Sequence, residues 1–284
     1  MEPDAVPPDN HAGTAAGPTV SVVIPALNEA ANLARVFAAI PDDVYEVLLV
    51  DGRSIDDTVA EARRLRPDVR IVEQTGSGKG NALACGFEQC RGDIIVMIDA
   101  DCSTDPAEIP AFVGALTAGA DFAKGSRFVV GGGSSDITRS RRQGNRVLNG
   151  LVNLLYGTRY TDLCYGYNAF WAAHLPVLGL DAGPRTDPLV KRWGDGFEIE
   201  TLINIRIARA GLRITEVPSF ERERLHGVSN LNAVSDGLRV LRIVVSEFRR
   251  PHLGDEVWQI LEPVPVLAPP GAVPSARLSV ESAS

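Results

Sequence analysis

The sequence has few cysteines, no excess of positive charge and no long hydrophobic run, and each shortage excludes a class of protein. The four cysteines, Cys85, Cys90, Cys102 and Cys164, show no CxxC spacing, so neither a zinc site nor a disulfide framework is predicted. We expect reduced thiols, as in the cytoplasm. The formal net charge of -8 argues against a non-specific nucleic-acid binder, because such proteins are usually basic.

Neither a membrane-spanning helix nor a signal peptide is predicted. No stretch holds the roughly 18 consecutive apolar residues that a spanning helix needs. The acidic, proline-rich residues 1–18 have neither the basic start nor the apolar run of a signal peptide. Residues 1–18 and 251–284 have the Pro, Ala, Ser and Gly content of disordered tails. We therefore expect one folded domain over residues 19–250.

What the sequence does contain is a regular alternation of two patterns. Four short runs are rich in β-branched residues, as in strands that are buried on both faces of a sheet: VSVVIP, YEVLLVD, VRIVEQ and DIIVMID. The segments between them carry apolar residues at helical spacing. This order predicts an α/β fold with a mainly parallel, Rossmann-like sheet flanked by helices. Such sheets bind ligands beyond the carboxyl ends of their strands, where Pro25, Asp51 and Asp99 lie.

The most informative stretch is MIDADCSTDP, residues 97–106. Asp99 and Asp101 stand two residues apart at a strand end, so both side chains point to the same side. Two carboxylates beside a buried strand are costly unless a positive group neutralises them. Mg²⁺ and Mn²⁺ favour such oxygen ligands, and Mg²⁺ is usually held by one or two carboxylates and substrate phosphates. The alternative is a simple turn, with Asp105 capping the helix that begins at Pro106.

Three other strand ends give weaker indications. Asn28 is placed to cap a helix. Asp51, on a turn made by Gly52, can accept hydrogen bonds from a base or a ribose. The segment TGSGKGNAL fails the Walker pattern, because Lys79 is followed by neither Ser nor Thr. A flexible glycine turn can still bring Lys79 to a ligand phosphate, and the alternative is a solvated lysine that opens a helix.

Taken together and in order, six segments resemble glycosyltransferase family 2, and within it the dolichol-phosphate mannosyltransferase and polyprenyl-phosphate glycosyltransferase group: VVIPALNEAANL, VLLVDGRSIDDT, GKGNAL, GDIIVMIDADCSTDP, KGSRF and GFEIETLINIRIARAGLRITEVP. The resemblance covers Val20 to Phe248. It implies a GT-A fold, Mg²⁺ or Mn²⁺ as the cofactor, and an inverting transfer of a hexose. The donor would be a nucleotide diphosphate sugar, UDP-glucose or GDP-mannose, and the acceptor a polyprenyl phosphate.

The resemblance also implies a donor site at the strand ends. The residues that would bind the donor are Pro25, Ala26, Asn28, Glu29, Asp51, Lys79, Asp99, Ala100 and Asp101. Within this set, Asp99 and Asp101 would hold the metal, with Ser103 in the place of the third, variable ligand of the family. Arg127 in KGSRF would be a catalytic residue near the donor phosphates and the acceptor.

By the same resemblance, Arg224 and Ser229 would bind the acceptor phosphate. The sequence departs from the family pattern at two positions. Arg53 replaces the usual Gly of the turn after the second strand, and Asn230 replaces a Lys after Ser229. The second change removes a positive charge from the expected acceptor site.

The acceptor decides which group must act as a base. The oxygen of a lipid phosphate is already anionic, so orientation can replace a strong base. A hydroxyl acceptor needs a carboxylate to take its proton, and Asp195 or Glu198 in WGDGFEIE is the catalytic candidate. The same fold acting on a soluble hydroxyl acceptor, such as a natural product or metabolite, is therefore one alternative. A nucleotidyltransferase and a non-catalytic nucleotide-sugar binding module are the others.

Two segments combine arginines with apolar residues at helical spacing, residues 139–155 and 233–250. Arginines beside an apolar stripe are typical of a helix that rests on anionic lipid. The alternative is a pair of helices packed on the sheet, with arginines in solvent or near the donor phosphates. We therefore expect a cytoplasmic protein, with peripheral contact at the inner face of the membrane as one of these two interpretations.

Overall fold

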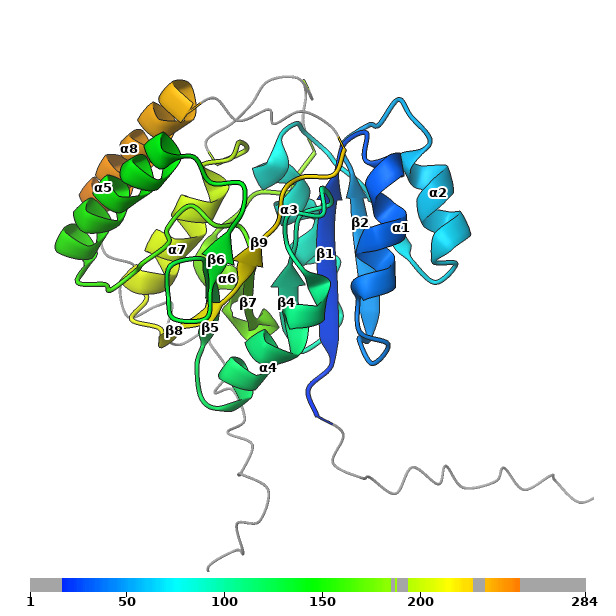
Figure 1. The fold of residues 1–284 in the computed structure, drawn as a ribbon, viewed down its shortest axis with the longest axis horizontal. Coiled ribbons are helices and arrows are strands. Elements are labelled where there is room, and N and C mark those ends of the chain that lie inside the picture. Colours follow the sequence, from blue (N-terminus) through cyan, green and yellow to red (C-terminus); the bar gives the residue numbers. More distant parts are fainter. Residues whose placement is uncertain (1–16, 185–186, 188–193, 227–232, 251–284) are drawn as a thin grey trace, which may run out of the picture.

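A seven-stranded sheet forms the centre of the computed structural model, which describes residues 17–184, 187, 194–226 and 233–250 (Figure 1). The strand order is β3-β2-β1-β4-β7-β5-β8, and every neighbouring pair is parallel except those of β7, which is antiparallel to β4 and β5. The mainly parallel sheet predicted from the sequence is thus confirmed. The bounds are β1 Val20–Ala26, β2 Glu46–Asp51, β3 Arg70–Glu73, β4 Ile94–Met97, β5 Phe122–Ser126, β7 Asn168–Trp171 and β8 Ile214–Pro218.

Helices cover both faces of this sheet. One face packs against α1 (Ala30–Ala39), α2 (Thr58–Leu65) and α4 (Ile109–Thr117), and the 3₁₀ turn η1 (Pro106–Glu108) precedes α4. The other face packs against α3 (Lys79–Glu88), α6 (Leu175–Leu178) and α7 (Ile199–Arg209), and the 3₁₀ turn η2 (Ala172–His174) precedes α6. Two further helices, α5 (Arg139–Tyr156) and α8 (Ala233–Arg249), lie side by side beyond α7 (Figure 1). A small second sheet pairs β6 (Gly133–Ser134) with β9 (Phe220–Glu221).

The strand sequences explain this double coverage. Val22 and Ile24 of β1 belong to the core on one face, and Val23 belongs to the core on the other. Because successive strand residues point to opposite faces, only a continuous apolar run can serve two cores. The run VRIVEQ is the exception, since the prediction that it is buried on both faces is wrong. It forms β3 (Arg70–Glu73) at the edge of the sheet, where these four residues are half-buried or exposed, although the flanking Val69 and Gln74 are buried.

Three asparagines attach α5 to the chain segment 160–164. Asn145, Asn149 and Asn153 follow one another at intervals of four residues, so they lie on one face of the helix. Each side-chain amide both donates a hydrogen bond to that segment and accepts one from it. This asparagine row fixes the position of Asp162, which lies within the segment.

The structure provides information on membrane-spanning helices but almost none on the two predicted tails. Within the ranges that the structure describes, each helix is too short or too polar to cross a bilayer. The predicted tails, residues 1–18 and 251–284, fall outside the described residues except for Gly17 and Pro18.

Candidate active site

The carboxyl ends of three neighbouring strands form the edge where the sequence places the site. β1 lies between β2 and β4. The register pairs Ala26 with Asp51, which is nearly buried and accepts a hydrogen bond from the backbone N–H of Ser54 at 3.2 Å. It also pairs Val23 with Met97, so Asp99 follows just beyond the end of β4. The strand-end residues that we expected together are thus neighbours in the sheet.

Both carboxylates of the DAD stretch are paired with basic side chains. Lys79 Nζ lies 2.5 Å from Asp99 Oδ1, and Arg224 Nη2 lies 2.7 Å from Asp101 Oδ2. The second oxygen of Asp101 accepts a hydrogen bond from the backbone N–H of Ser103 at 2.9 Å. The positive charge that these carboxylates require is thus supplied by the chain itself, from segments that are distant in the sequence.

Lys79, the first residue of α3, also contacts a carboxylate that the sequence analysis did not select. Its Nζ lies 2.6 Å from Glu200 Oε1 on α7. Burial alone would lower the pKa of Lys79, but the nearby charges of Asp99 and Glu200 outweigh it and raise that pKa. Burial raises the pKa of the Glu200 carboxyl, against the attraction of Lys79. A signal for Glu200 does exist in FEIETLI, because a charge within an apolar run of a helix implies a buried partner.

Close backbone contacts hold Lys79 and Glu200 against each other. The backbone N–H of Gly80 donates to the carbonyl of Asp195 at 2.9 Å, and a Cβ at Gly80 would lie 1.8 Å from the carbonyl oxygen of Gly194. A Cβ at Gly166 would lie 2.5 Å from Glu200 Oε1 and 2.8 Å from Lys79 Nζ. Glycine is therefore required at Gly80, where a Cβ would overlap backbone atoms, and the GSGKG turn is packed tightly rather than flexible.

Asn28 does not cap α1, so that prediction is wrong. The N-cap residue is Glu29, whose side chain makes no capping bond. Asn28 has φ 58, and its Oδ1 accepts a hydrogen bond from the backbone N–H of Ile55 at 2.8 Å. Its own N–H donates to Ser54 Oγ at 2.9 Å. Asn28 therefore joins the loop after β1 to the loop after β2 at the expected donor site.

The turn after β2 depends on Arg53 rather than on a glycine. Arg53 has φ 65, which costs a residue with a side chain about 1 kcal/mol. Its guanidinium donates to the backbone carbonyls of Gly76 and Gln74 at 2.9 and 3.1 Å. These bonds offset the strain and tie this turn to the one that precedes Lys79, which gives a physical reason for arginine at this position.

The structure places Arg127 inside an ion-pair cluster. Its Nε and Nη2 lie 2.7 and 2.9 Å from the two carboxylate oxygens of Asp162, and its Nη1 lies 2.9 Å from Glu221 Oε1. The guanidinium also stacks over the ring of Tyr165, 4.8 Å from its centroid. Asp162 therefore both orients the guanidinium of Arg127 and forms a buried ion pair with it.

The two candidate bases are buried beside the GSGKG turn. Asp195 is in contact with that turn through its backbone carbonyl. Glu198 Oε1 accepts a hydrogen bond from the backbone N–H of Gly196 at 3.3 Å, while its Oε2 has no hydrogen-bond partner among the described residues. Glu198 is thus the better placed of the two to accept a proton.

A short segment after β9, residues 222–226, crosses the DAD turn. The backbone N–H of Arg222 donates to the carbonyl of Ser103 at 2.8 Å, and its guanidinium donates to Asp105 at 2.7 Å. Asp105 also caps η1 by accepting from the backbone N–H of Ala107, as predicted. Ser229 and Asn230 lie outside the described residues.

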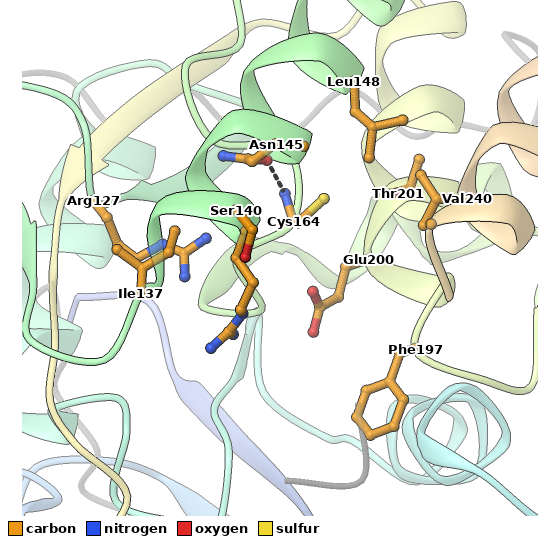
Figure 2. Close-up of a pocket in the computed structure, with 13 residues that line it drawn as sticks. Arg127, Ile137, Ser140, Asn145, Leu148, Cys164, Phe197, Glu200, Thr201 and Val240 are labelled. Carbon is orange, nitrogen blue, oxygen red and sulfur yellow. Dashed lines mark hydrogen bonds between the residues drawn. The ribbon is translucent and has the colours of Figure 1, made fainter. Parts of the chain in front are cut away.

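A cavity of about 160 Å³ lies between α5, α7 and α8 (Figure 2). Its polar lining consists of Arg127, Ser140, Arg141, Asn145, Glu200 and Thr201, and its apolar lining includes Ile137, Leu148, Phe197 and Val240. Figure 2 shows Glu200 pointing into the cavity from the α7 side and Leu148 from the α5 side. Because Glu200 also contacts Lys79, the cavity adjoins the carboxylate edge of the sheet. The sequence analysis did not predict it.

The residues at this edge fit a divalent cation. Asp99 and Asp101 offer hard carboxylate oxygens in the turn that follows β4, rather than on an extended strand as expected, and the Asp99 side chain is 27% exposed. No group of three or more His, Cys, Asp or Glu with metal-ligand geometry occurs in the described ranges. Such a pair suits Mg²⁺ or Mn²⁺ whose remaining ligands come from substrate phosphates and water.

Comparison with protein families and curated proteins gives concordant matches. The model of "Glycosyl transferase family 2" matches residues 21–175. An undecaprenyl-phosphate mannosyltransferase of Micrococcus luteus is 33% identical over 233 residues, which are 79% of this chain and 92% of that protein. A dolichol-phosphate mannosyltransferase of Pyrococcus furiosus is 38% identical over 221 residues, which are 75% of this chain and 59% of that protein.

Solved structures of one enzyme, the glucosyl-3-phosphoglycerate synthase of Mycobacterium tuberculosis, share the fold. Its complex with Mn²⁺, UDP and glucosyl-3-phosphoglycerate has a TM-score of 0.61 and 25% sequence identity. The match covers 84% of this chain and 82% of that one. A second complex, with Mg²⁺ and UDP, has a TM-score of 0.62.

Proposed function

Because the chain belongs to glycosyltransferase family 2 and has the GT-A fold, we propose that it transfers a hexose from a nucleotide diphosphate sugar to a polyprenyl phosphate. UDP-glucose and GDP-mannose are the proposed donors. Relatives named for undecaprenyl phosphate and dolichol phosphate support this class of acceptor. The nucleotidyltransferase and the non-catalytic module are set aside by membership of the family.

One observation carries the choice of acceptor, namely the cavity between α5, α7 and α8. Its lining combines two arginines with apolar side chains. A phosphate head bound to an apolar chain matches this combination, because Arg141 can attract the phosphate while the apolar side chains exclude water from the chain. The cavity adjoins the proposed metal carboxylates through Glu200 and Lys79. An acceptor phosphate held there would be close to the donor.

The donor side would use the strand ends. Asp51 is placed to accept hydrogen bonds from the base or ribose. Asp99 and Asp101 would hold Mg²⁺ or Mn²⁺, with Ser103 beside them. The bound cation would neutralise the charge that develops on the nucleoside diphosphate as it leaves. Arg224, which we propose as a contact for the acceptor phosphate, pairs with Asp101 and so lies next to this donor side.

The acceptor side needs orientation more than a base. A phosphate oxygen is anionic at neutral pH, so it can attack without losing a proton in the same step. The chain has to hold that oxygen in line with the bond to the leaving diphosphate and keep water out. Arg141 lines the cavity and is the proposed contact for the phosphate. Arg127 shares the cavity wall, but Asp162 and Glu221 already neutralise its charge, so its proposed part is to hold that wall in place.

A second candidate is transfer to a soluble hydroxyl acceptor. The buried, unpartnered Oε2 of Glu198 favours it, because a hydroxyl must lose a proton and Glu198 can take it. The glucosyl-3-phosphoglycerate synthase structures share the fold, and that enzyme is named for a small phosphorylated product. In this candidate Glu198 would be the catalytic base.

We also propose that α5 and α8 rest on the inner face of a membrane when the lipid acceptor is used. Their outer faces, side by side in Figure 1, carry exposed apolar residues. Val147 and Leu154 of α5 are 70% and 80% exposed, and Leu238 of α8 is 64% exposed. Further exposed residues on α8 are Leu241, Val245 and Phe248. Arginines on both helices suit an anionic lipid surface.

Transfer of radiolabelled sugar tests the two acceptors directly. UDP-glucose and GDP-mannose are each supplied with Mn²⁺ or Mg²⁺, and the acceptor is either a polyprenyl phosphate or phosphoglyceric acid. Label in a butanol-extractable product that requires both lipid phosphate and metal supports the first proposal. Label only in a water-soluble product contradicts it and supports the second. Co-sedimentation with anionic vesicles, compared between wild type and Leu238→Glu, tests the membrane surface, with the exposed Ile55→Glu as the control.

A further inference from the structure

Lys79 forms an ion pair with Asp99, which is one of the two proposed metal ligands. Its ammonium lies between Asp99, at 2.5 Å, and Glu200, at 2.6 Å. The Lys79 and Glu200 side chains are 10% and 11% exposed, so water screens this pair weakly. Asp99 stands at the end of β4 among the proposed ligands, whereas Glu200 comes from α7 and faces the cavity. The lysine is thus shared between a proposed metal ligand and a carboxylate outside the metal site.

A divalent cation and an ammonium repel each other when both are bound to one carboxylate. Binding of the cation at Asp99 must therefore weaken or break the contact between Lys79 and Asp99. A buried ammonium without an anionic partner would be strongly unfavourable. Glu200 avoids this cost, because it already contacts Lys79 and can remain its anionic partner after the cation has bound to Asp99.

The packing around the pair limits what else can happen. Gly80 lets the start of α3 pack directly on the backbone of Gly194, and Gly166 places its own backbone close to the ends of the Lys79 and Glu200 side chains. Lys79 begins α3, whose N-terminal backbone is bound to the carbonyl of Asp195. The ammonium can therefore leave Asp99 by a small side-chain rotation toward Glu200, without a rearrangement of the backbone.

We propose that Lys79 is an internal counter-ion that competes with the divalent cation for Asp99, and that Glu200 is a positioning residue that holds Lys79 once the cation is bound. The inference rests on the proposed metal site at Asp99 and Asp101. Its consequence is that Glu200 sets the affinity for the cation although it is not a ligand. The cation affinity of the proposed donor-side metal site would thus depend on a carboxylate in the cavity wall.

Binding of Mn²⁺ in the absence of any sugar donor tests this inference without turnover. The free ion is followed by its electron paramagnetic resonance signal. Glu200→Gln removes the competing charge, so Lys79 stays on Asp99 and Mn²⁺ binds about tenfold more weakly, as expected for one close charge. The double variant Lys79→Met/Glu200→Gln keeps the net charge and removes the competitor, so Mn²⁺ binds about tenfold more tightly than to wild type.

The effect of Glu200→Gln on Mn²⁺ affinity must also depend on the presence of Lys79. In the Lys79→Met background, Glu200→Gln should leave Mn²⁺ affinity nearly unchanged, because the carboxylate acts through the lysine. An equal loss in both backgrounds would overturn the inference, since Glu200 would then act by its own charge. Glu247→Gln, which alters another buried carboxylate in an ion pair on α8, is the matched control and should not change Mn²⁺ binding.

A crystal structure of the wild-type protein with Mn²⁺ and UDP gives a second test that needs no variant to fold. The inference expects Lys79 Nζ within hydrogen-bond distance of Glu200 and beyond that distance from Asp99. Retention of the Asp99 contact would overturn it. If wild type binds no Mn²⁺ with or without UDP, the proposed metal site itself fails, and the inference fails with it. Normal Mn²⁺ binding that no variant alters rejects only the inference.

Discussion

Arg127 and Asp162 form a bidentate ion pair inside the protein, with Nε and Nη2 of the arginine 2.7 and 2.9 Å from the two carboxylate oxygens. Their side chains are 3% and 0% exposed. Asp162 also accepts a hydrogen bond from Asn145 of α5 at 2.9 Å, and Arg127 reaches Glu221 of β9. The pair therefore connects the strand β5, the helix α5 and the small second sheet.

Arg127→Met should destabilise the protein strongly. The substitution leaves the Asp162 and Glu221 carboxylates buried without their partner, and breaking a buried pair in this way typically costs about 3–5 kcal/mol. Urea unfolding measures the loss. The control is Arg213→Met, because Arg213 makes a similar pair with Asp121 but is exposed to solvent, so its loss should be much smaller. Equal losses in the two variants would contradict a structural role for the Arg127 pair.

Asp99→Asn should lower the rate of metal-dependent hexose transfer by at least about 100-fold. The change removes a charged oxygen from the proposed metal site, and a cation at the leaving diphosphate supplies several kcal/mol of transition-state stabilisation. Initial rates over a Mn²⁺ titration measure the effect. Asp93→Asn is the control, since Asp93 precedes the same strand at its other end and accepts hydrogen bonds from Thr19. A fully active Asp99→Asn would exclude the metal assignment.

Leu148→Trp should block the cavity without affecting the donor. The larger ring fills much of a space of about 160 Å³, so the KM for the acceptor should rise at least about tenfold, as when a binding subsite loses roughly 1.4 kcal/mol. Binding of UDP, measured by calorimetry, should not change. Val130→Trp, at an exposed position between β5 and β6 and outside both helices, is the control. A rise in acceptor KM of the same size in both variants would place the acceptor elsewhere.

Lys124 should give the stability a distinctive dependence on pH. It is fully buried, and its ammonium donates to the carbonyls of Tyr165 and Gly125 at 2.6 and 2.9 Å. Burial lowers the pKa of Lys124 to about 8, while in the unfolded chain the usual value near 10.5 applies. Between these two pKa values the unfolded chain binds a proton that the folded protein does not, so the free energy of unfolding rises with pH.

The measurement is urea unfolding of wild type and Lys124→Met between pH 7 and 10.5. Relative to the variant, wild type should gain up to about 1.4 kcal/mol per pH unit above pH 8 and nothing below it. The variant supplies the control, because it keeps every other titrating group. A constant difference across this range would mean that Lys124 keeps its ordinary pKa in the folded protein.

The sequence allows four of the strands and one part of the site to be predicted, because both depend on local patterns. Continuous β-branched runs mark β1, β2 and β4, whereas β5 (FAKGS) and β7 (NAFW) lack such a run. The position of Asp99 and Asp101 follows from where the β4 run ends. β3 departs from this rule because an edge strand has the same local composition as a central one. Its place in the sheet depends on pairing partners, which the local pattern does not contain.

Other features of the site arise from contacts between distant segments. Lys79 and Glu200 are 121 residues apart, and only the packing of α3 against α7 brings them together. Asn28 has the residue type of a helix cap, but its side-chain oxygen instead accepts a hydrogen bond from the backbone N–H of Ile55 in the next loop. In both cases a tertiary contact overrides or supplements what the neighbouring residues indicate.

The row of asparagines on α5 restricts how this helix can change in length. Successive residues of an α-helix are rotated by about 100° from each other. Inserting or deleting one residue between Asn145 and Asn153 would therefore turn part of the row away from residues 160–164 and break several of its hydrogen bonds. We expect natural and engineered variants to keep the number of residues between these asparagines, and to vary α5 in length only before Asn145 or beyond Asn153.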